Sequence, residues 1–143
     1  MTGDASNAPA RYVIKSVNID RSAGDVHAFL ADVTNWPRWA VVNILAVEPS
    51  STAGWWTIET PYGPAELRLH ADPATGIVDH DFRDRESPDE AAVVPARVVA
   101  NGRGAHVSMT IFQPAELTDA DFDREMAAVD RELATLKELL ERG

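Results

Sequence analysis

The stretch from Thr118 to Arg142 constrains the fold of this chain more than any other. Its apolar residues recur three or four positions apart, and charged residues fill most of the positions between them. The apolar set is Phe122, Met126, Val129, Leu133, Leu136 and Leu140. This spacing places the whole set on one stripe of an α-helix about 36 Å long, with Thr118 as the N-cap. A helix of that length with one apolar stripe must lie across an apolar surface.

Length, charge and cysteine content narrow the class of protein. The chain has 143 residues, which is enough for one domain with a substantial core. It has no cysteine, so disulfides, thiolate catalysis and cysteine metal sites are excluded. The formal net charge of −10 argues against nucleic acid or an anionic membrane as a partner. No signal-peptide pattern and no long uncharged run is present, so we expect a soluble cytoplasmic protein without a membrane span.

The N-terminal region predicts a tail, a strand and two short helices. Residues 1–10 are small and polar, and we expect a flexible tail followed by a single domain over residues 11–143. Residues 11–20 alternate in the manner of a strand. Ser22 is a suitable N-cap for a short helix, and a further turn over residues 33–36 is expected to stop at Pro37.

Residues 41–113 predict six further strands separated by short turns. The expected strands are 42–47, 55–60, 65–71, 77–83, 93–100 and 105–112. Their short connections indicate antiparallel hairpins, because a parallel crossover needs a dozen residues or more. One sheet with early short helices and one late long helix is an α+β plan.

The loop at residues 73–76 sets the register of the hairpin around it. Opposite charges then face each other on one side of the sheet, at the pairs Arg68–Asp81, Glu66–Arg83 and His70–Asp79. Apolar partners meet on the other side, at the pairs Leu67–Phe82 and Leu69–His80. Because both faces are self-consistent, this register predicts that His80 points to the apolar face.

The neighbouring hairpins extend the same two faces. A four-residue loop at residues 61–64 pairs Trp56 with Leu69, Ile58 with Leu67 and Thr60 with Ala65. One cost of this register is that Glu59 then opposes Glu66. In the last hairpin, either a two- or a four-residue loop around Gly102 puts the same residues inward: Val94, Ala96, Val98, Val107, Met109 and Ile111. The sheet therefore has one apolar face, which the C-terminal helix is long enough to cover.

In this order of elements the chain resembles the Bet v1-like helix-grip superfamily, which includes START lipid-transfer domains and polyketide cyclases. The local similarities are residues 35–39 (NWPRW), the strand at residues 76–80, and residues 107–113 running into the last helix. The resemblance covers nearly the whole chain. It implies a bent sheet wrapped around the helix, enclosing an apolar cavity.

The resemblance also implies a ligand, which would be a small hydrophobic or aromatic molecule of lipid or polyketide type. The candidate binding residues are Trp36, Trp39, Trp56, Ile58, Thr60, Tyr62, Leu67, Leu69, Phe82, Met109, Phe122 and Met126. Taken singly, each is better explained as an ordinary core residue, whereas the resemblance favours a cavity for the set. His80 is either a structural histidine with satisfied hydrogen bonds or the polar contact of the pocket. We expect no cofactor and no metal site, because no two histidines have ligand spacing.

Three functions remain open on these grounds. The first is binding or carriage of a hydrophobic ligand. The second is a cyclase or dehydratase with His80 as general acid/base and Thr60 or Tyr62 orienting the substrate. The third is a protein-binding module that uses the charged face of the sheet. We favour binding, because catalysis usually needs several convergent polar groups. A homo-oligomer is compatible with the sequence but not indicated by it.

Several polar residues are expected at the surface, outside any site. His27 is expected on the exposed side of the first helix, and His70 and His106 point outward by the register above. Asp79 and Asp81 are expected to be solvated partners of His70 and Arg68.

Overall fold

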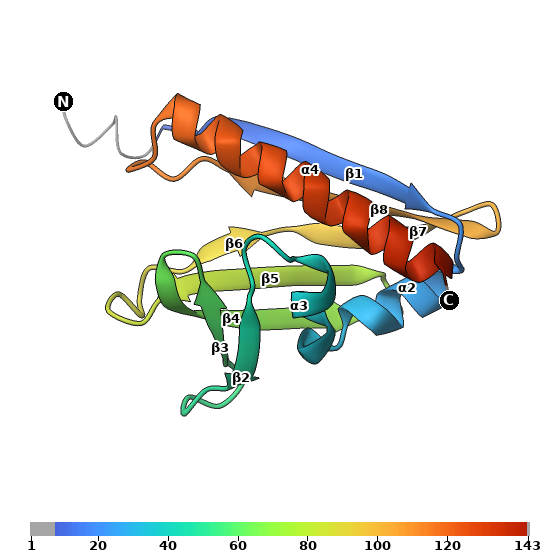
Figure 1. Ribbon diagram of the computed structural model, residues 1–143, viewed down its shortest axis with the longest axis horizontal. Helices are drawn as coiled ribbons and strands as arrows, with labels where there is room; N and C mark the ends of the chain where they lie inside the picture. Colours follow the sequence, from blue (N-terminus) through green and yellow to red (C-terminus); the bar gives the residue numbers. More distant parts are fainter. Residues whose placement is uncertain (1–7, 143) are drawn as a thin grey trace.

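The computed structural model describes residues 8–142 and contains one eight-stranded antiparallel sheet with a long helix across it (Figure 1). Residues 1–7 of the expected tail lie outside the described residues. The elements are β1 (Tyr12–Ile19), α2 (Ala23–Leu30), the 3-10 turn η1 (Val33–Asn35), α3 (Trp36–Trp39), β2 (Ala46–Pro49), β3 (Trp56–Thr60), β4 (Gly63–Asp72), β5 (Ile77–Asp84), β6 (Ala92–Val94), β7 (Ala96–Asn101), β8 (Gly104–Phe112) and α4 (Asp119–Arg142). The strand order is β1-β8-β7-β5-β4-β3-β2, and β6 pairs with β5. The α+β plan and its order of elements are confirmed.

The register of the β4–β5 hairpin agrees with the sequence at every predicted pair, including Leu69 with His80. The β3–β4 register differs from the prediction by two residues. The connecting turn has two residues, so that Thr60 pairs with Gly63 and Trp56 with Leu67. A shift of two leaves every side chain on its predicted face. It also removes the predicted clash of like charges, because Glu59 now lies opposite Pro64.

The strand expected over residues 93–100 is divided at Pro95 into β6 and β7. Proline has no backbone N–H to donate to a neighbouring strand, which explains the break. The Asp79 side chain accepts a hydrogen bond of 2.8 Å from the Ala96 backbone N–H at this point. The strand is therefore interrupted at Pro95, and the backbone N–H of Ala96, the first residue of β7, still has an acceptor.

Two predictions about residues 33–47 were wrong in detail: the position of Pro37 and the start of the strand that follows. Pro37 does not end a helix; it lies in the first turn of α3, where no intrahelical N–H is needed. The strand expected over residues 42–47 begins only at Ala46. The N–H groups of Val42 and Asn43 instead donate to the carboxylate of Glu132 on α4.

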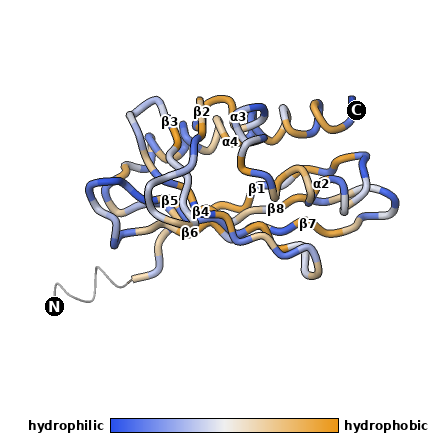
Figure 2. Tube along the Cα trace, turned by 90° about the horizontal axis from the view of Figure 1, so that it is seen from below, coloured by the Kyte–Doolittle hydropathy of each residue, from blue (hydrophilic) through white to orange (hydrophobic). Residues whose placement is uncertain are grey.

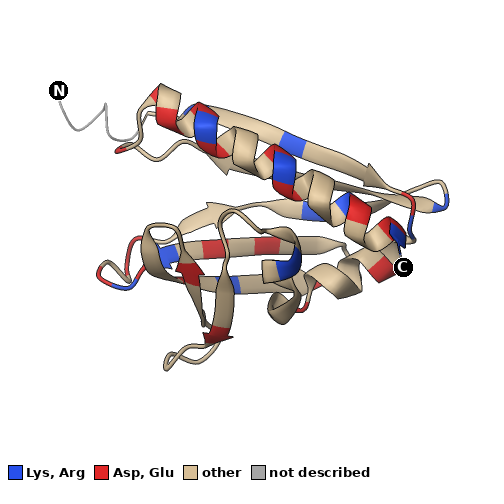
Figure 3. Ribbon diagram, viewed as in Figure 1, with Lys and Arg blue, Asp and Glu red and all other residues tan. Residues whose placement is uncertain are grey.

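Helix α4 buries the predicted stripe against the inner face of the sheet. Phe122, Met126, Leu133, Leu136 and Leu140 are buried, and Val129 is half-buried. Hydrophobic residues recur along α4 and along the strands in Figure 2. Charged residues follow the helix along its whole length in Figure 3. The observed burial confirms that the helix is amphipathic and lies across the sheet.

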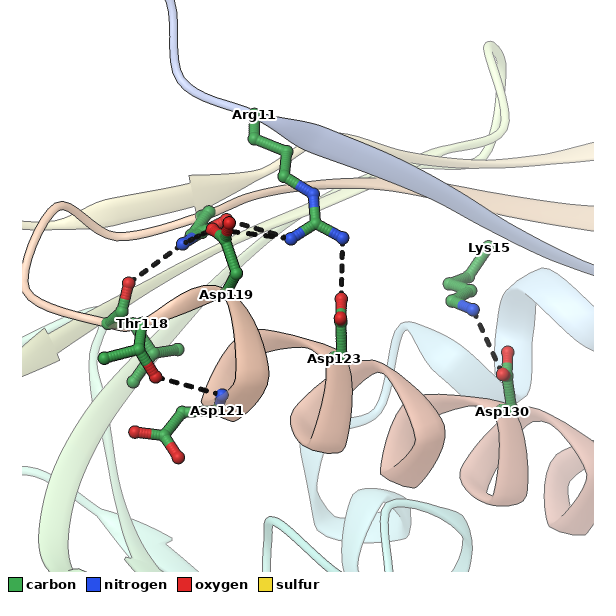
Figure 4. Close-up of polar contacts among 9 residues, drawn as sticks. Arg11, Lys15, Thr118, Asp119, Asp121, Asp123 and Asp130 are labelled. Carbon is green, nitrogen blue, oxygen red and sulfur yellow. Dashed lines mark hydrogen bonds and ion pairs between the residues drawn. The ribbon is translucent and has the colours of Figure 1, made fainter.

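The N-terminal half of α4 is also attached to the edge strand β1 by surface ion pairs (Figure 4). Arg11 lies 2.6 Å from Asp123, and Lys15 lies 3.0 Å from Asp130. Thr118 caps the helix by accepting a hydrogen bond from the Asp121 N–H at 3.2 Å. Exposed pairs of this kind contribute little stability each, so the apolar stripe is the main attachment.

The outer face of the sheet holds a cluster built around Trp55, which is only 6% exposed. The guanidinium of Arg83 lies 3.7 Å from the centre of its ring and that of Arg68 lies 4.5 Å away. Both cations are paired, Arg83 with Glu66 at 2.9 Å and Arg68 with Asp81 at 2.8 Å. The outer charges therefore satisfy one another and bury a tryptophan beneath them.

Gly76, in the β4–β5 turn, packs closely against the backbone of Val98 in β7, and this contact can be tested. Its φ is +80°, and a Cβ there would lie 2.1 Å from the Val98 carbonyl oxygen. We expect Gly76→Ala to lower the free energy of unfolding by about 3 kcal/mol or more, since backbone strain and a backbone clash add together. Gly102→Ala, also at positive φ but with no atom near the added methyl, is the control, expected to cost about 1–2 kcal/mol. Equal losses in urea denaturation would contradict the close approach.

Candidate functional site

A small cavity lies between α4, α3 and the inner face of the sheet. Its lining residues come from six elements: Leu30, Trp36, Trp39, Val78, His80, Ala96, Val107, Met109 and Leu136. The cavity volume is about 10 Å³, which corresponds to about one water molecule. The expected space between sheet and helix is therefore present but nearly closed in this structure.

His80 is the one ionisable side chain among the nine that line this cavity. It is 4% exposed, and its ring packs edge-on against Trp36 and Phe82, with centroid distances of 4.9 and 5.4 Å. Its Nδ1 lies 3.1 Å from the Val78 carbonyl oxygen. Because a carbonyl only accepts, Nδ1 carries the proton. Burial lowers the pKa of His80 to about 4, so the ring is neutral near pH 7 and Nε2 is a hydrogen-bond acceptor.

Both tryptophans of α3 line the cavity together with His80. Their ring centroids are 5.0 Å apart. The Trp36 Nε1–H donates to the Leu30 carbonyl oxygen at 2.9 Å. The Trp39 Nε1–H has no acceptor, and within residues 8–142 it is the single buried side-chain nitrogen or oxygen in that condition. Both indole rings line the cavity, but only the N–H of Trp36 is hydrogen-bonded.

Four of the predicted site residues meet at the cavity, namely Trp36, Trp39, His80 and Met109. The others lie elsewhere on the inner face or at its margin. Ile58, Leu67, Phe122 and Met126 are buried, and Trp56, Leu69 and Phe82 are half-buried against the same core. None of these seven lines the cavity.

The two hydroxyl-bearing candidates are not placed to contact a ligand there. Tyr62 lies in the β3–β4 turn and is 87% exposed, which corrects the expectation that it faces a pocket end. Thr60 is half-buried, and its Oγ1 donates to the Gly63 carbonyl oxygen at 2.8 Å. Its hydroxyl therefore stabilises the turn.

Five lining residues were not among the predicted ligand contacts: Leu30, Val78, Ala96, Val107 and Leu136. Their inward orientation was available from strand parity and from the helix stripe. The sequence did not indicate which segment of α4 lies opposite which strand, because that depends on how the sheet bends around the helix.

His27 and Asp81 are both buried, contrary to expectation. His27 is 6% exposed, and its Nε2 lies 3.0 Å from the Ile77 carbonyl oxygen, so α2 turns this side chain toward the sheet. Asp81 points outward as predicted but is 4% exposed beneath Arg68 and His70. Burial opposes its ionisation, yet hydrogen bonds from His70 and Arg68 outweigh that effect and lower the pKa of Asp81.

Glu132 of α4 fixes the segment that follows α3. It is 4% exposed, and its carboxylate accepts hydrogen bonds from the backbone N–H of Val42 at 3.1 Å and of Asn43 at 2.9 Å. A third comes from the Asn43 side-chain amide at 2.9 Å. Burial raises the pKa of Glu132, and the three hydrogen bonds act in the opposite direction. This contact connects the segment carrying Trp36 and Trp39 to the helix that closes the cavity.

A larger groove of about 640 Å³ lies between α2, the β4–β5 turn and β7. It is open to solvent and lined mainly by alanine, glycine and valine. Its one histidine, His27, already has a backbone partner at Nε2. The groove lacks the convergent polar groups that orient a ligand, so we place the candidate site at His80.

Comparison with solved structures gives the fold. The Zhui aromatase/cyclase from Streptomyces sp. R1128 is 18% identical, with a TM-score of 0.66, over 92% of this chain and 94% of that chain. Ara h 8.0201 is 13% identical, with a TM-score of 0.65, over 94% and 99%. The fold is the helix-grip fold of Bet v1-like proteins.

A third structure with this fold is the di-domain ARO/CYC BexL from the BE-7585A biosynthetic pathway. It is 20% identical, with a TM-score of 0.67, over 90% of this chain and 45% of that chain. This chain thus spans about half the length of BexL. No protein-family model matches the sequence, and no curated protein matches it. At these identities the likeness establishes the fold and leaves the activity open.

No helix within residues 8–142 is both long and apolar enough to cross a membrane. Over the same residues, no group of three or more histidine, aspartate or glutamate side chains is arranged to hold a metal ion.

The Glu132 contact can be tested by substitution. We expect Glu132→Ala to lower the free energy of unfolding by roughly 2–4 kcal/mol, because three donors lose their acceptor. Glu125→Ala is the control on the same helix, since Glu125 has no hydrogen-bond partner among the described residues and burial raises the pKa of its carboxyl. Its loss should be neutral or slightly stabilising. Similar effects of both substitutions in urea denaturation would exclude a role for Glu132 in holding the segment.

Burial of neutral His80 predicts a pH-dependent loss of stability. Above pH 6.5 the ring is neutral in both the folded and the unfolded chain; between pH 6.5 and 4 only the unfolded chain binds the proton. Lowering the pH through this window therefore destabilises the folded state, by about 3 kcal/mol at pH 4. Urea denaturation from pH 7 to pH 4 should show this extra loss in the wild type relative to His80→Phe. Parallel profiles of the two proteins would show that His80 is not buried in the neutral form.

Proposed function

We propose that this protein binds a small hydrophobic molecule between α4 and the inner face of the sheet, with His80 as the polar contact. The observation that carries the proposal is a buried neutral imidazole with a free Nε2 in a cavity whose other eight lining residues are aliphatic, aromatic or methionine. Ligand sites typically combine an apolar lining with few, well-placed polar groups. The helix-grip fold, seen here and in Ara h 8.0201 and the Zhui aromatase/cyclase, supports a ligand at this position only at the level of the fold.

Binding requires the cavity to widen from its present 10 Å³. Two of its walls are suited to this. Met109 has a flexible, unbranched side chain that adapts to irregular shapes. Helix α3 is a single turn outside the sheet, so its displacement breaks no hydrogen bond between strands, while Glu132 keeps the segment after it attached to α4. We propose that displacement of α3 and Met109 admits the ligand while the sheet stays unchanged.

The geometry supports binding better than acid–base catalysis. A general base works best with a pKa near the working pH, whereas burial lowers the pKa of His80 to about 4. No second ionisable group lines the cavity, and Asp79 and Asp81 extend from the opposite face of β5. The cyclase names of BexL and Zhui describe those proteins, and the shared fold does not transfer their reaction.

The proposal is tested by occupying the cavity with a larger side chain. Native mass spectrometry of the protein isolated from its own source should show a co-purifying hydrophobic molecule, and calorimetry should show binding of naphthalene. Ala96→Leu places a larger side chain among the lining residues, and we expect it to reduce naphthalene affinity at least tenfold. Ala128→Leu, at a buried alanine of α4 that does not line the cavity, is the control and should retain binding. Unchanged affinity in Ala96→Leu, or no binding by the wild type, would reject the proposed site.

A further inference from the structure

The indole N–H of Trp39 is a hydrogen-bond donor without an acceptor. Trp39 is 4% exposed, lines the cavity beside His80, and its Nε1 has no partner within the described residues. Buried donors in folded proteins are nearly always paired, because an unpaired one loses its bond to water on folding. The Trp39 N–H is therefore a donor available to a molecule that occupies the cavity.

His80 supplies the complementary half of this arrangement. Its Nδ1–H is engaged by the Val78 carbonyl, which leaves Nε2 as a bare acceptor with no protein partner among residues 8–142. The cavity lining thus includes one residue with an unpaired donor, Trp39, and one with an unpaired acceptor, His80. Trp36 lines the same cavity, but its N–H is already bonded to the Leu30 carbonyl oxygen.

We propose that the ligand is an alcohol or a phenol, and that its hydroxyl oxygen accepts from the Trp39 Nε1–H while its proton is donated to the His80 Nε2. This inference rests on the proposed function and adds the chemical class of the ligand. The cavity volume of about 10 Å³ fits one hydroxyl group, so the polar end of the ligand occupies it and the hydrocarbon part displaces α3 and Met109.

Ketones, ethers and carboxylates satisfy only part of this pair. A ketone or an ether accepts from Trp39 but has no proton for His80. A carboxylate also only accepts, and its charge would be transferred into an apolar lining with no cation among the nine residues. A neutral hydroxyl is the smallest group that both accepts and donates. The hydrogen-bonding pattern therefore selects hydroxyl compounds over their ketone, ether and hydrocarbon analogues.

A matched series of three compounds tests this selection on the wild-type protein. The series is 1-naphthol, 1-methoxynaphthalene and naphthalene, with affinities measured by calorimetry at pH 7. We expect 1-naphthol to bind roughly tenfold or more tightly than naphthalene, since it gains two hydrogen bonds. The methoxy compound, which lacks the proton for His80, should bind more weakly than 1-naphthol. This comparison needs no variant and therefore does not depend on the folding of one.

Substitutions assign the two contacts. Trp39→Phe and His80→Phe should each reduce the preference for 1-naphthol over naphthalene. Trp56→Phe is the control, because this half-buried indole does not line the cavity, and it should leave the preference unchanged. The sequence has four tryptophans, and the ¹⁵N indole signal missing from Trp39→Phe identifies Trp39. That signal should shift when the wild type binds 1-naphthol and shift less with naphthalene.

The outcomes separate this inference from the proposed function. Equal affinity for 1-naphthol and naphthalene would overturn the hydroxyl assignment while the site between sheet and helix remained supported. Equal affinity for 1-naphthol and the methoxy compound would overturn the donation to His80. A loss of preference in Trp56→Phe equal to that in Trp39→Phe would overturn the assignment to Trp39. Failure of all three compounds to bind would reject both this inference and the proposed function.

Discussion

Leu133, Leu136 and Leu140 of α4 pack against the inner face of the sheet, and the rest of the structure depends on this contact. Full burial of one leucine contributes about 1.5–3 kcal/mol, which is far more than an exposed ion pair such as Arg11–Asp123 contributes. The same helix brings Glu132 to the segment after α3. One helix therefore closes the core, contributes Leu136 to the cavity lining and holds the segment that follows the two tryptophans.

The sheet separates two kinds of chemistry because side chains alternate along each strand. On the outer side of β5, Asp81 and Arg83 belong to paired clusters around Trp55 and His70. On the inner side, His80 meets only apolar and aromatic neighbours and one carbonyl group. Adjacent residues of one strand, His80 and Asp81, thus differ in charge: one is neutral and the other is ionised. The carboxyl group of Asp81 is held ionised by hydrogen bonds from His70 and Arg68, and the imidazole of His80 is held neutral by burial.

The small size of the cavity bears on the unpaired indole N–H of Trp39. A volume near 10 Å³ excludes an organic molecule, yet the donor at Trp39 and the acceptor at His80 suit a polar group of about that size. The lining element that belongs to no sheet is the short helix α3, and the segment after it is bonded to Glu132 of α4. Ligand affinity in this arrangement would depend on the energy needed to displace α3 as well as on the contacts made.

The sequence by itself determined the elements, the faces of the strands and the β4–β5 register. These follow from local spacing and from charge matching across short turns, so the inward position of His80 was predictable. The β3–β4 turn was predicted too long, because the sequence around Tyr62 permits two loop lengths of equal parity. The tertiary structure alone decided the burial of His27 and Glu132 and the small size of the cavity. Their partners, Ile77 and Val42–Asn43, lie 50 and about 90 residues away along the chain. Contacts at such separations depend on how the sheet bends around α4, and no local pattern encodes that bend.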